Sequence, residues 1–141
     1  MERIRHKVFS VDEANQLLPY LDEAIGEIAT LSRKIIDLRG EIEVLSAIEL
    51  SGATSASADV RSLREKEQNA ARLIERFRQV LEEVAAHGCI LRDIDLGLVD
   101  FYAMAQGRIV CLCWRRGEPR IEHWHPLDQG FSGRRPIADL P

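Results

Sequence analysis

Residues 121–135 concentrate the side chains of this sequence that are most suited to chemistry. The run reads IEHWHPLDQGFSGRR and holds two histidines, two arginines, an aspartate and a tryptophan. Histidine nitrogens bind metals and transfer protons near neutral pH, and arginine guanidinium groups bind carboxylates and phosphates. The run therefore indicates three alternatives: a metal site, an anion site or an acid–base site.

A metal site would combine this run with two cysteines that precede it. Side chains two residues apart on a strand share a face, so Cys111 and Cys113 form one pair and His123 and His125 another. A five-residue turn over 116–120 would place Cys113 opposite His123 and Cys111 opposite His125, whereas a two- or four-residue turn would put the pairs on opposite faces. Zinc is thus allowed, but C-x-C with H-x-H is not a usual zinc spacing. We expect buried thiols and no cofactor, with zinc as the alternative.

An anion site is the second alternative. Arginines flank the glycine-containing segment 130–133, and glycine lets backbone N–H groups approach a ligand. No strand–loop–helix with a lysine is present, so this is not a P-loop. The alternative to an anion site is a structural role, in which the segment is a C-terminal loop whose Arg134 pairs with Asp128 or Glu118.

Acid–base chemistry is the third alternative, with a histidine oriented by a carboxylate as the base. The candidate polar or ligand site at the sheet edge comprises Asp100, Glu118, Trp124, His125, Asp128 and Arg134. A polar network that fastens the C-terminal loop to the sheet explains the same residues, and we favour it. Asp100 lies inside an apolar strand and needs donors, which Arg134 or a backbone turn would supply.

These residues belong to a β-rich second half. Short apolar runs separated by glycine-containing turns predict a meander of three or four antiparallel strands over 89–126. A C-terminal loop follows over 127–141. So small a sheet needs a partner to cover one of its faces.

The first half predicts a long helix over 10–50. Ser10 and Glu13 have the spacing of a capping box. The apolar seam behind it advances in alternating steps of four and three residues, which is a heptad pattern. The seam consists of Leu17, Leu21, Ala24, Ile28, Leu31, Ile35, Leu38, Ile42 and Leu45.

A small polar loop over 51–58 leads to a second predicted helix over 59–87, capped by Asp59 and ended by Gly88. Its expected seam is Leu63, Glu67, Ala70, Ile74, Phe77, Leu81 and Val84. Two amphipathic helices joined by a short loop should pack as an antiparallel hairpin. The sequence thus predicts one α+β domain over residues 1–141: a long helical hairpin followed by a small antiparallel sheet.

Composition limits the function classes. The 141 residues carry a net charge of −4, so the chain lacks the basic surface typical of nucleic-acid binding. No apolar run reaches the ~20 residues needed to cross a membrane. Three cysteines and no signal peptide lead us to expect a reducing, cytoplasmic location.

Several motifs recur in a known order: residues 9–19 (FSVDEANQLLP), 97–101 (GLVDF), 112–114 (LCW), and then Glu118, Trp124-His125, Asp128, Gly130-Phe131 and Gly133-Arg134. Through them the chain resembles a bacterial family known as domain of unknown function 2203. The resemblance covers nearly the whole chain and implies no activity. Cys111 and His123 fall where the family's pattern does not demand those residue types.

We therefore expect a non-enzymatic interaction or scaffolding module that forms a homodimer through its helices. The sheet would present Trp124, His125 and Arg134 to an unknown protein partner or a small anion. The alternative is a small-ligand, anion or metal-binding protein, or a hydrolytic enzyme, with its site around His125, Asp128 and Arg134.

Overall fold

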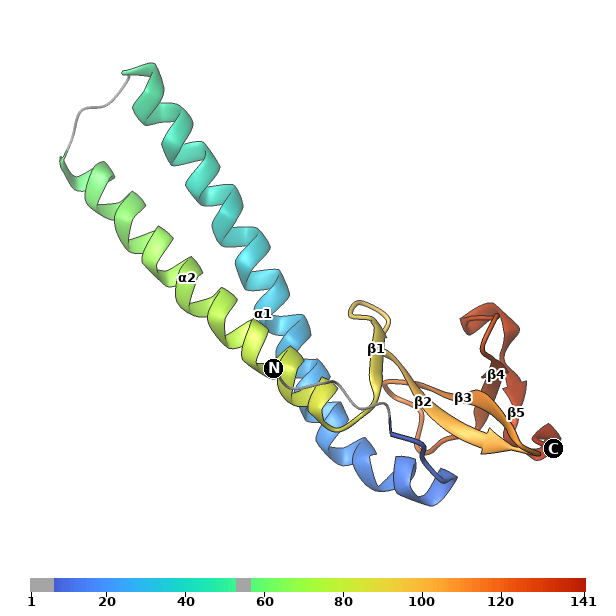
Figure 1. The fold of residues 1–141 in the computed structure, drawn as a ribbon. Coiled ribbons are helices and arrows are strands. Elements are labelled where there is room, and N and C mark those ends of the chain that lie inside the picture. Colours follow the sequence, from blue (N-terminus) through green and yellow to red (C-terminus); the bar gives the residue numbers. More distant parts are fainter. Residues whose placement is uncertain (1–6, 53–56) are drawn as a thin grey trace. The chain divides into compact units, whose positions relative to one another are not determined.

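The computed structural model describes residues 7–52 and 57–141 and has the predicted α+β arrangement, two helices followed by an antiparallel sheet (Figure 1). Its elements are α1 (Val11–Ser51), α2 (Ser57–Ala86), β1 (Ile90–Asp93), β2 (Leu98–Ala105), β3 (Arg108–Arg115), β4 (His123–Pro126), β5 (Arg135–Pro136) and two short 3₁₀ helices, Phe131–Gly133 and Ile137–Asp139. The chain divides into two compact units. We call residues 28–80 the arm, and residues 7–27 with 81–141 the sheet unit. The prediction of a single domain stays a prediction.

The predicted start of α1 is confirmed. The Ser10 amide donates to Glu13 Oε1 and the Glu13 amide to Ser10 Oγ, both at 3.1 Å, which completes the capping box. The other helix differs slightly from expectation. It begins at Ser57, so Asp59 lies in the first turn and not at the cap, and it ends at Ala86, before Gly88 with φ +90°. Most of the predicted loop between the helices, residues 53–56, lies outside the described residues.

The seam of α1 is the predicted one, whereas that of α2 differs from the prediction at two positions. Along α1, Ile28, Leu31 and Ile35 are buried, and Leu38, Ile42 and Leu45 are half-buried. Along α2 the buried or half-buried side chains of the seam are those of Leu63, Lys66, Ala70, Leu73, Phe77, Val80, Leu81 and Val84. Two of the seven predicted seam positions, Glu67 and Ile74, are therefore exposed, and in each case the preceding residue is covered. Glu67 is exposed because a carboxylate stays in water when it can, and Lys66 and Leu73 lie at the covered positions instead.

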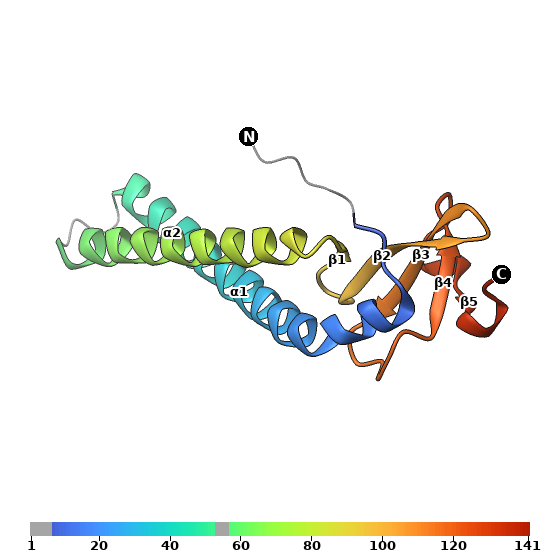
Figure 2. The ribbon, with the colours of Figure 1, turned by 60° about the horizontal axis from the view of Figure 1, so that its bottom comes forward.

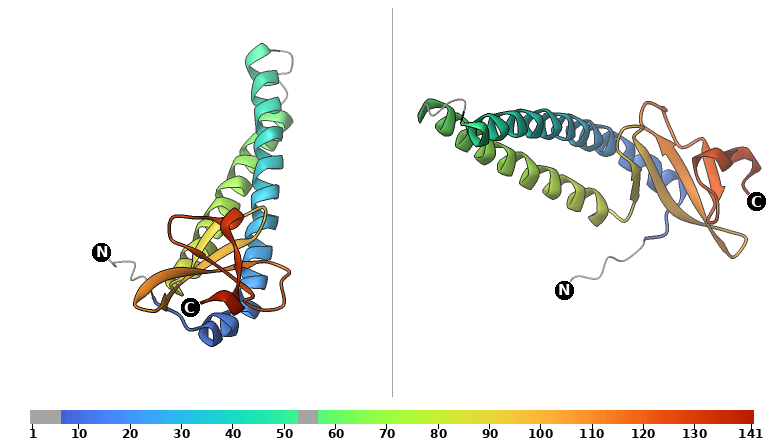
Figure 3. Two further views of the ribbon diagram at one scale, coloured as in Figure 1. Left: turned by 90° about the vertical axis from the view of Figure 1, so that its right-hand side faces the viewer. Right: turned by 90° about the horizontal axis from the view of Figure 1, so that it is seen from above.

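The sheet has five strands in the order β1-β2-β3-β4-β5, each antiparallel to its neighbour (Figure 3). The fifth strand forms within the segment predicted as a C-terminal loop. It is only two residues long, and it pairs Pro136 with His123 and Arg135 with Trp124. So short a strand leaves no periodic signal in the sequence.

One face of the sheet contributes to the core. Val99, Phe101, Leu112 and Trp114 alternate with residues of the opposite face and are all buried. The N-terminal segment joins the same core through Phe9, whose ring packs edge-on against Phe101 at 5.2 Å and whose amide donates to the Tyr102 carbonyl.

The N-terminal part of α1 lies beside the sheet within the sheet unit (Figure 2). Asn15 and Asp22 of α1 hold the β3–β4 connection to this helix. Asn15 Oδ1 accepts a 2.7 Å hydrogen bond from the Ile121 amide, and Arg116 Nε lies 3.0 Å from Asp22 Oδ1. These bonds fix the turn that sets how β4 returns along β3.

Among the described residues, no helix is both long enough and apolar enough to cross a membrane.

Candidate functional site

Asp100 is the centre of the candidate site. It lies in the middle of β2, where it pairs with Cys113 of β3, and it is 3% exposed. On the other side of β3, Cys111 pairs with His125 and Cys113 with His123, which is the register expected for a turn over 116–120, although the connection spans 116–122. Strand alternation therefore places these side chains on one face, opposite the face that holds Phe101 and Trp114.

The side-chain nitrogens of two residues face the Asp100 carboxylate. Arg92 Nε donates to Oδ2 at 2.9 Å, and His125 Nε2 lies 3.1 Å from Oδ1. The pairing of β1 with β2 shifts between Leu91 and Asp93, and this bulge directs the Arg92 side chain toward Asp100. The donors of Asp100 are therefore Arg92 and His125, whereas the sequence had indicated Arg134 or a backbone turn.

Hydrogen bonding fixes the imidazole of His125. The residue is 2% exposed, and its Nδ1 lies 2.8 Å from the carbonyl oxygen of Pro126. Because a carbonyl accepts only, Nδ1 carries a proton and Nε2 is the nitrogen that faces Asp100. Each ring nitrogen therefore has one oxygen neighbour.

Cys113 completes a buried group. One ligand atom from each of Asp100, Cys113 and His125 lies within 4.8 Å of the others. Burial, reinforced by the charge of Asp100, raises the pKa of the Cys113 thiol to about 12. Burial likewise raises the pKa of Cys111 to about 11. A thiol in this state is a poor nucleophile, so the geometry does not favour a cysteine hydrolase.

Glu118 and Arg134 form a second cluster. Arg134 Nη2 donates to Glu118 Oε1 at 2.5 Å and to the Cys113 carbonyl at 3.2 Å, and the Arg115 amide donates to the same Glu118 oxygen at 2.6 Å. His123 Nδ1 lies 3.4 Å from the other oxygen of Glu118. Of the two partners that the sequence offered Arg134, the structure selects Glu118.

The net effect of this cluster is to lower the pKa of Glu118. Burial acts to raise this pKa, but the hydrogen bonds from Arg134 and the Arg115 amide outweigh it. Glu118 also fixes the turn after β3, since its carbonyl accepts from Trp114 Nε1 at 2.9 Å. These contacts are those expected of a network that fastens the C-terminal segment to the sheet.

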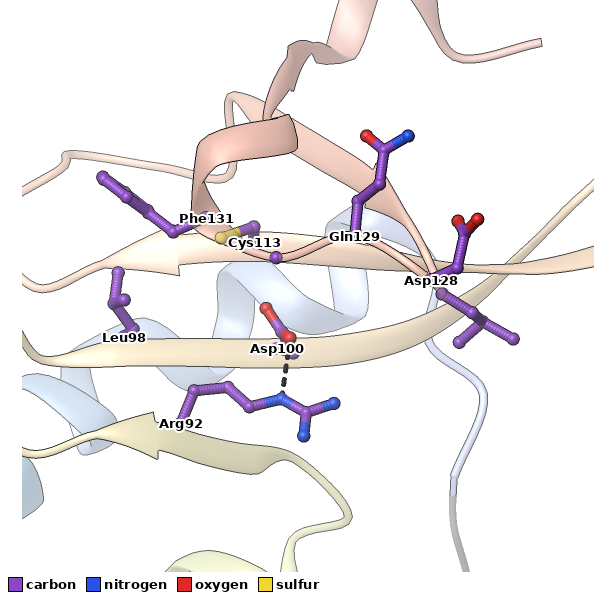
Figure 4. A pocket seen from close by; sticks show the side chains of 9 residues that line it. Arg92, Leu98, Asp100, Cys113, Asp128, Gln129 and Phe131 are labelled. Carbon is purple, nitrogen blue, oxygen red and sulfur yellow. Dashed lines mark hydrogen bonds and ion pairs between the residues drawn. The ribbon is translucent and has the colours of Figure 1, made fainter.

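A cavity of about 310 Å³ opens beside Asp100. Figure 4 shows Asp100 between Arg92 and Cys113, with Asp128, Gln129 and Phe131 on the segment that passes over them. The other lining residues are Leu98, Leu127 and Gly130. Asp128 is exposed, so of the two acids on this cavity only Asp100 is buried. With two acids against one arginine, the lining suits a cation better than an anion.

The six candidate residues therefore do not converge on one point. Asp100, His125 and Asp128 belong to the cavity side of the sheet, and Glu118 and Arg134 form the neighbouring cluster. Trp124 alternates to the opposite face, where it is 5% exposed and its ring lies under the Arg135 guanidinium. Trp124 does not present a surface to a partner, because strand alternation turns it into the core.

Arg92 is the residue that sequence reasoning missed. Its signal was present: a basic residue in the middle of a short apolar strand, which needs an acid nearby. The bulge that directs it toward Asp100 depends on pairing between strands and leaves no mark in the sequence around it.

The family model for the uncharacterized conserved protein DUF2203 matches residues 7–137. The chain belongs to this family. The matched range includes Asp100, Cys113, His125 and the Glu118–Arg134 pair. No curated protein and no solved structure matches the chain. Membership of the DUF2203 family therefore confirms the resemblance drawn from the motifs, and any role of its polar clusters rests on their geometry.

Proposed function

We propose that this protein is a non-enzymatic interaction module that self-associates, with the arm of a second copy as the partner of its own arm. The observation that carries the proposal is a stripe of exposed apolar side chains beside the seam. Ile36 is 66% and Leu50 is 89% exposed on α1, and Val60 is 40% and Ile74 is 39% exposed on α2. Exposed apolar side chains that line up on one surface, unlike scattered ones, mark interaction sites.

The stripe has the periodicity of a packing surface. Ile36 and Leu50 are fourteen residues apart, and so are Val60 and Ile74. Fourteen residues are two heptads, so the members of each pair occupy the same position around their helix. Ile36 follows the seam residue Ile35 directly, just as Ile74 follows Leu73.

The two halves of the stripe face the same side of the hairpin. In antiparallel helices, residues displaced in the same sense from their seams point to the same side. Lys66 of α2 binds Glu41 of α1 at 3.2 Å and so aligns the two helices. This register brings Ile36 and Ile74 within about one turn of each other in height along the arm, and Leu50 and Val60 likewise.

A second copy would also cover the seam. Leu38, Ile42 and Leu45 stay half-buried with α2 alone against them. Two hairpins related by a two-fold axis form a four-helix bundle, in which such positions become core. Charge does not oppose this pairing, because residues 28–80 hold nine basic and eight acidic side chains.

The contacts of the C-terminal arginines favour self-association through the arm and not an anion site at the sheet edge. Arg134 is bound to Glu118, Arg116 to Asp22, and Arg120 Nε lies 3.7 Å from Glu122. An incoming carboxylate or phosphate would have to displace these acids.

The cytoplasm remains the proposed location, since Cys89, Cys111 and Cys113 are free thiols, as suits a reducing compartment.

Charge variants of the stripe test the proposal. Ile36→Glu and Ile74→Glu should each weaken self-association by at least about tenfold, because burying a charge in place of an isoleucine costs more than ~1.4 kcal/mol. Gln68→Glu is the matched control, since Gln68 is exposed and polar on the same helix as Ile74. Light scattering coupled to size-exclusion chromatography measures the molar mass. Equal behaviour of all three variants would refute the role of the stripe.

A further inference from the structure

Three neighbouring strands bring three different ligand types together. Asp100 comes from β2, Cys113 from β3 and His125 from β4, and all three residues are buried. Their carboxylate oxygen, sulfur and ring nitrogen lie within 4.8 Å of one another. In a tetrahedral zinc site neighbouring ligand atoms are ~3.3–3.7 Å apart, as metal–ligand distances of ~2.0–2.3 Å require. Side-chain rotations that move the ligand atoms by about an ångström would close the three residues around one ion.

His125 is already oriented as a metal ligand would be. Its Nδ1 donates to the Pro126 carbonyl at 2.8 Å, which leaves the Nε2 position facing Asp100. Metal-binding histidines are held in this way, with the second ring nitrogen bonded to a carbonyl or carboxylate.

The 3.1 Å separation of Nε2 and Asp100 Oδ1 needs a positive centre. Two lone pairs at that distance repel, so either a proton or a metal ion must lie between the two atoms. A proton makes the pair an imidazolium–carboxylate hydrogen bond. A metal ion makes both atoms ligands.

The surroundings of the group favour the metal. Arg92 Nε binds Asp100 Oδ2 at 2.9 Å, which holds the carboxylate while leaving Oδ1 directed at His125. Arg134 binds the carbonyl of Cys113 at 3.2 Å and holds its strand position. Both are outer contacts of the kind that orient ligands. Hydrogen bonding between His125 and Asp100 alone would not explain why a cysteine faces the same point.

We propose that Asp100, Cys113 and His125 bind one divalent transition-metal ion of the zinc class, through carboxylate oxygen, thiolate sulfur and Nε2. Mixed nitrogen, oxygen and sulfur donors select such ions over magnesium or calcium. On binding, the thiol proton of Cys113 leaves to solvent and the sulfur–metal bond forms. The cavity of about 310 Å³, lined by Asp100 and Cys113, has room for water as a fourth ligand. This site goes beyond the proposed self-association and does not depend on it.

Cobalt titration of tag-free, chelator-treated full-length protein tests the site. Cobalt gives a near-ultraviolet charge-transfer band only when a thiolate binds it. We expect one equivalent of cobalt with that band, and its displacement by one equivalent of zinc, read by elemental analysis. A chain that binds less than half an equivalent, or binds without the band, would overturn the proposal and leave the imidazolium pair in its place.

Neighbouring residues of the same type supply matched controls. Cys113→Ser and His125→Ala should abolish the band, whereas Cys111→Ser and His123→Ala should keep it, because only Cys113 and His125 belong to the group. The double variant Cys89→Ser/Cys111→Ser retains Cys113 alone and should show the full band, which keeps the test decisive if Cys113→Ser does not fold. Equal loss on substituting Cys111 and Cys113 would contradict the assignment.

Discussion

His125 Nε2 lies 3.1 Å from Asp100 Oδ1, and both side chains are almost fully buried. The pair joins β2 to β4 across β3, and Arg92 joins it from β1. Side chains from three of the five strands thus meet at one carboxylate. This places Asp100 at the point where loss of a single side chain would affect the sheet most.

Asp100→Ala should destabilise the protein by roughly 3 kcal/mol in the free energy of unfolding, because it leaves the buried His125 and the Arg92 guanidinium without their acceptor. Denaturant titration followed by circular dichroism measures the change. Asp128→Ala, at the exposed rim of the same cavity, is the control and should change the free energy by less than about 0.5 kcal/mol. A cost for Asp100→Ala no larger than that of the control would show that the pair does not hold the sheet.

The Glu118–Arg134 pair should make stability depend on pH. Because the pKa of Glu118 is lowered from 4.5 in the folded chain, its contribution is full above that value and is lost as pH falls through the lower folded pKa. The groups that face its carboxylate are Arg134, the Arg115 amide and His123. Relative to Glu118→Gln, the wild type should therefore be more stable at neutral pH, and the difference should shrink as the medium becomes acidic. Unfolding curves of both proteins across this range check the sign, and a difference that grows on acidification would contradict it.

The three thiols should be slow to react in the native state. All three are buried, and burial raises the pKa of Cys89 and Cys111 to about 11 and that of Cys113 to about 12. A chromogenic disulfide reagent added to metal-free protein should label none of them rapidly and all three after unfolding in denaturant. Rapid labelling of one native thiol would show a reactive cysteine that the packing does not predict.

Gly97, in the β1–β2 turn, should tolerate alanine less well than Gly107. Both have positive φ, at +66° and +76°, so the backbone strain is similar. A Cβ on Gly97 would lie 2.6 Å from the Cβ of Arg116, whereas a Cβ on Gly107 meets nothing within 4 Å. Gly97→Ala should thus cost about 1–3 kcal/mol more than Gly107→Ala in thermal or denaturant unfolding. Equal costs would mean that Arg116 can move aside.

The elements of the fold could be predicted from the sequence because each has a strong local signal. Three features were sufficient to place the helices. They are the capping box at Ser10 and Glu13, the seam from Leu21 to Leu45, and the glycine after α2. The seam of α2 was placed wrongly at Glu67 and Ile74, since heptad spacing alone does not decide between Leu73 and Ile74. Burial decides it, and burial depends on the other helix.

Most residues of the candidate site could be predicted from the sequence, whereas the contacts between their side chains could not. The register that pairs Cys111 with His125 was derived as a condition on the turn, and the structure has this register, although the connection between the two strands spans residues 116–122 and not 116–120. Neither the inward side of Trp124 nor the bulge at Arg92 could be deduced, because strand alternation gives two faces without saying which one the core covers. Asp100 was recognised as a buried acid in need of donors, but their identity depends on which strands are neighbours.

Sedimentation equilibrium of the wild-type protein tests self-association through the arm most directly. At tens of micromolar, we expect a molar mass of twice the 16.0 kDa of one chain. Dilution should lower the molar mass toward that of a single chain. The substitution Ile36→Glu should lower it in the same way at the undiluted concentration. A wild-type mass of one chain at tens of micromolar would contradict the proposed function.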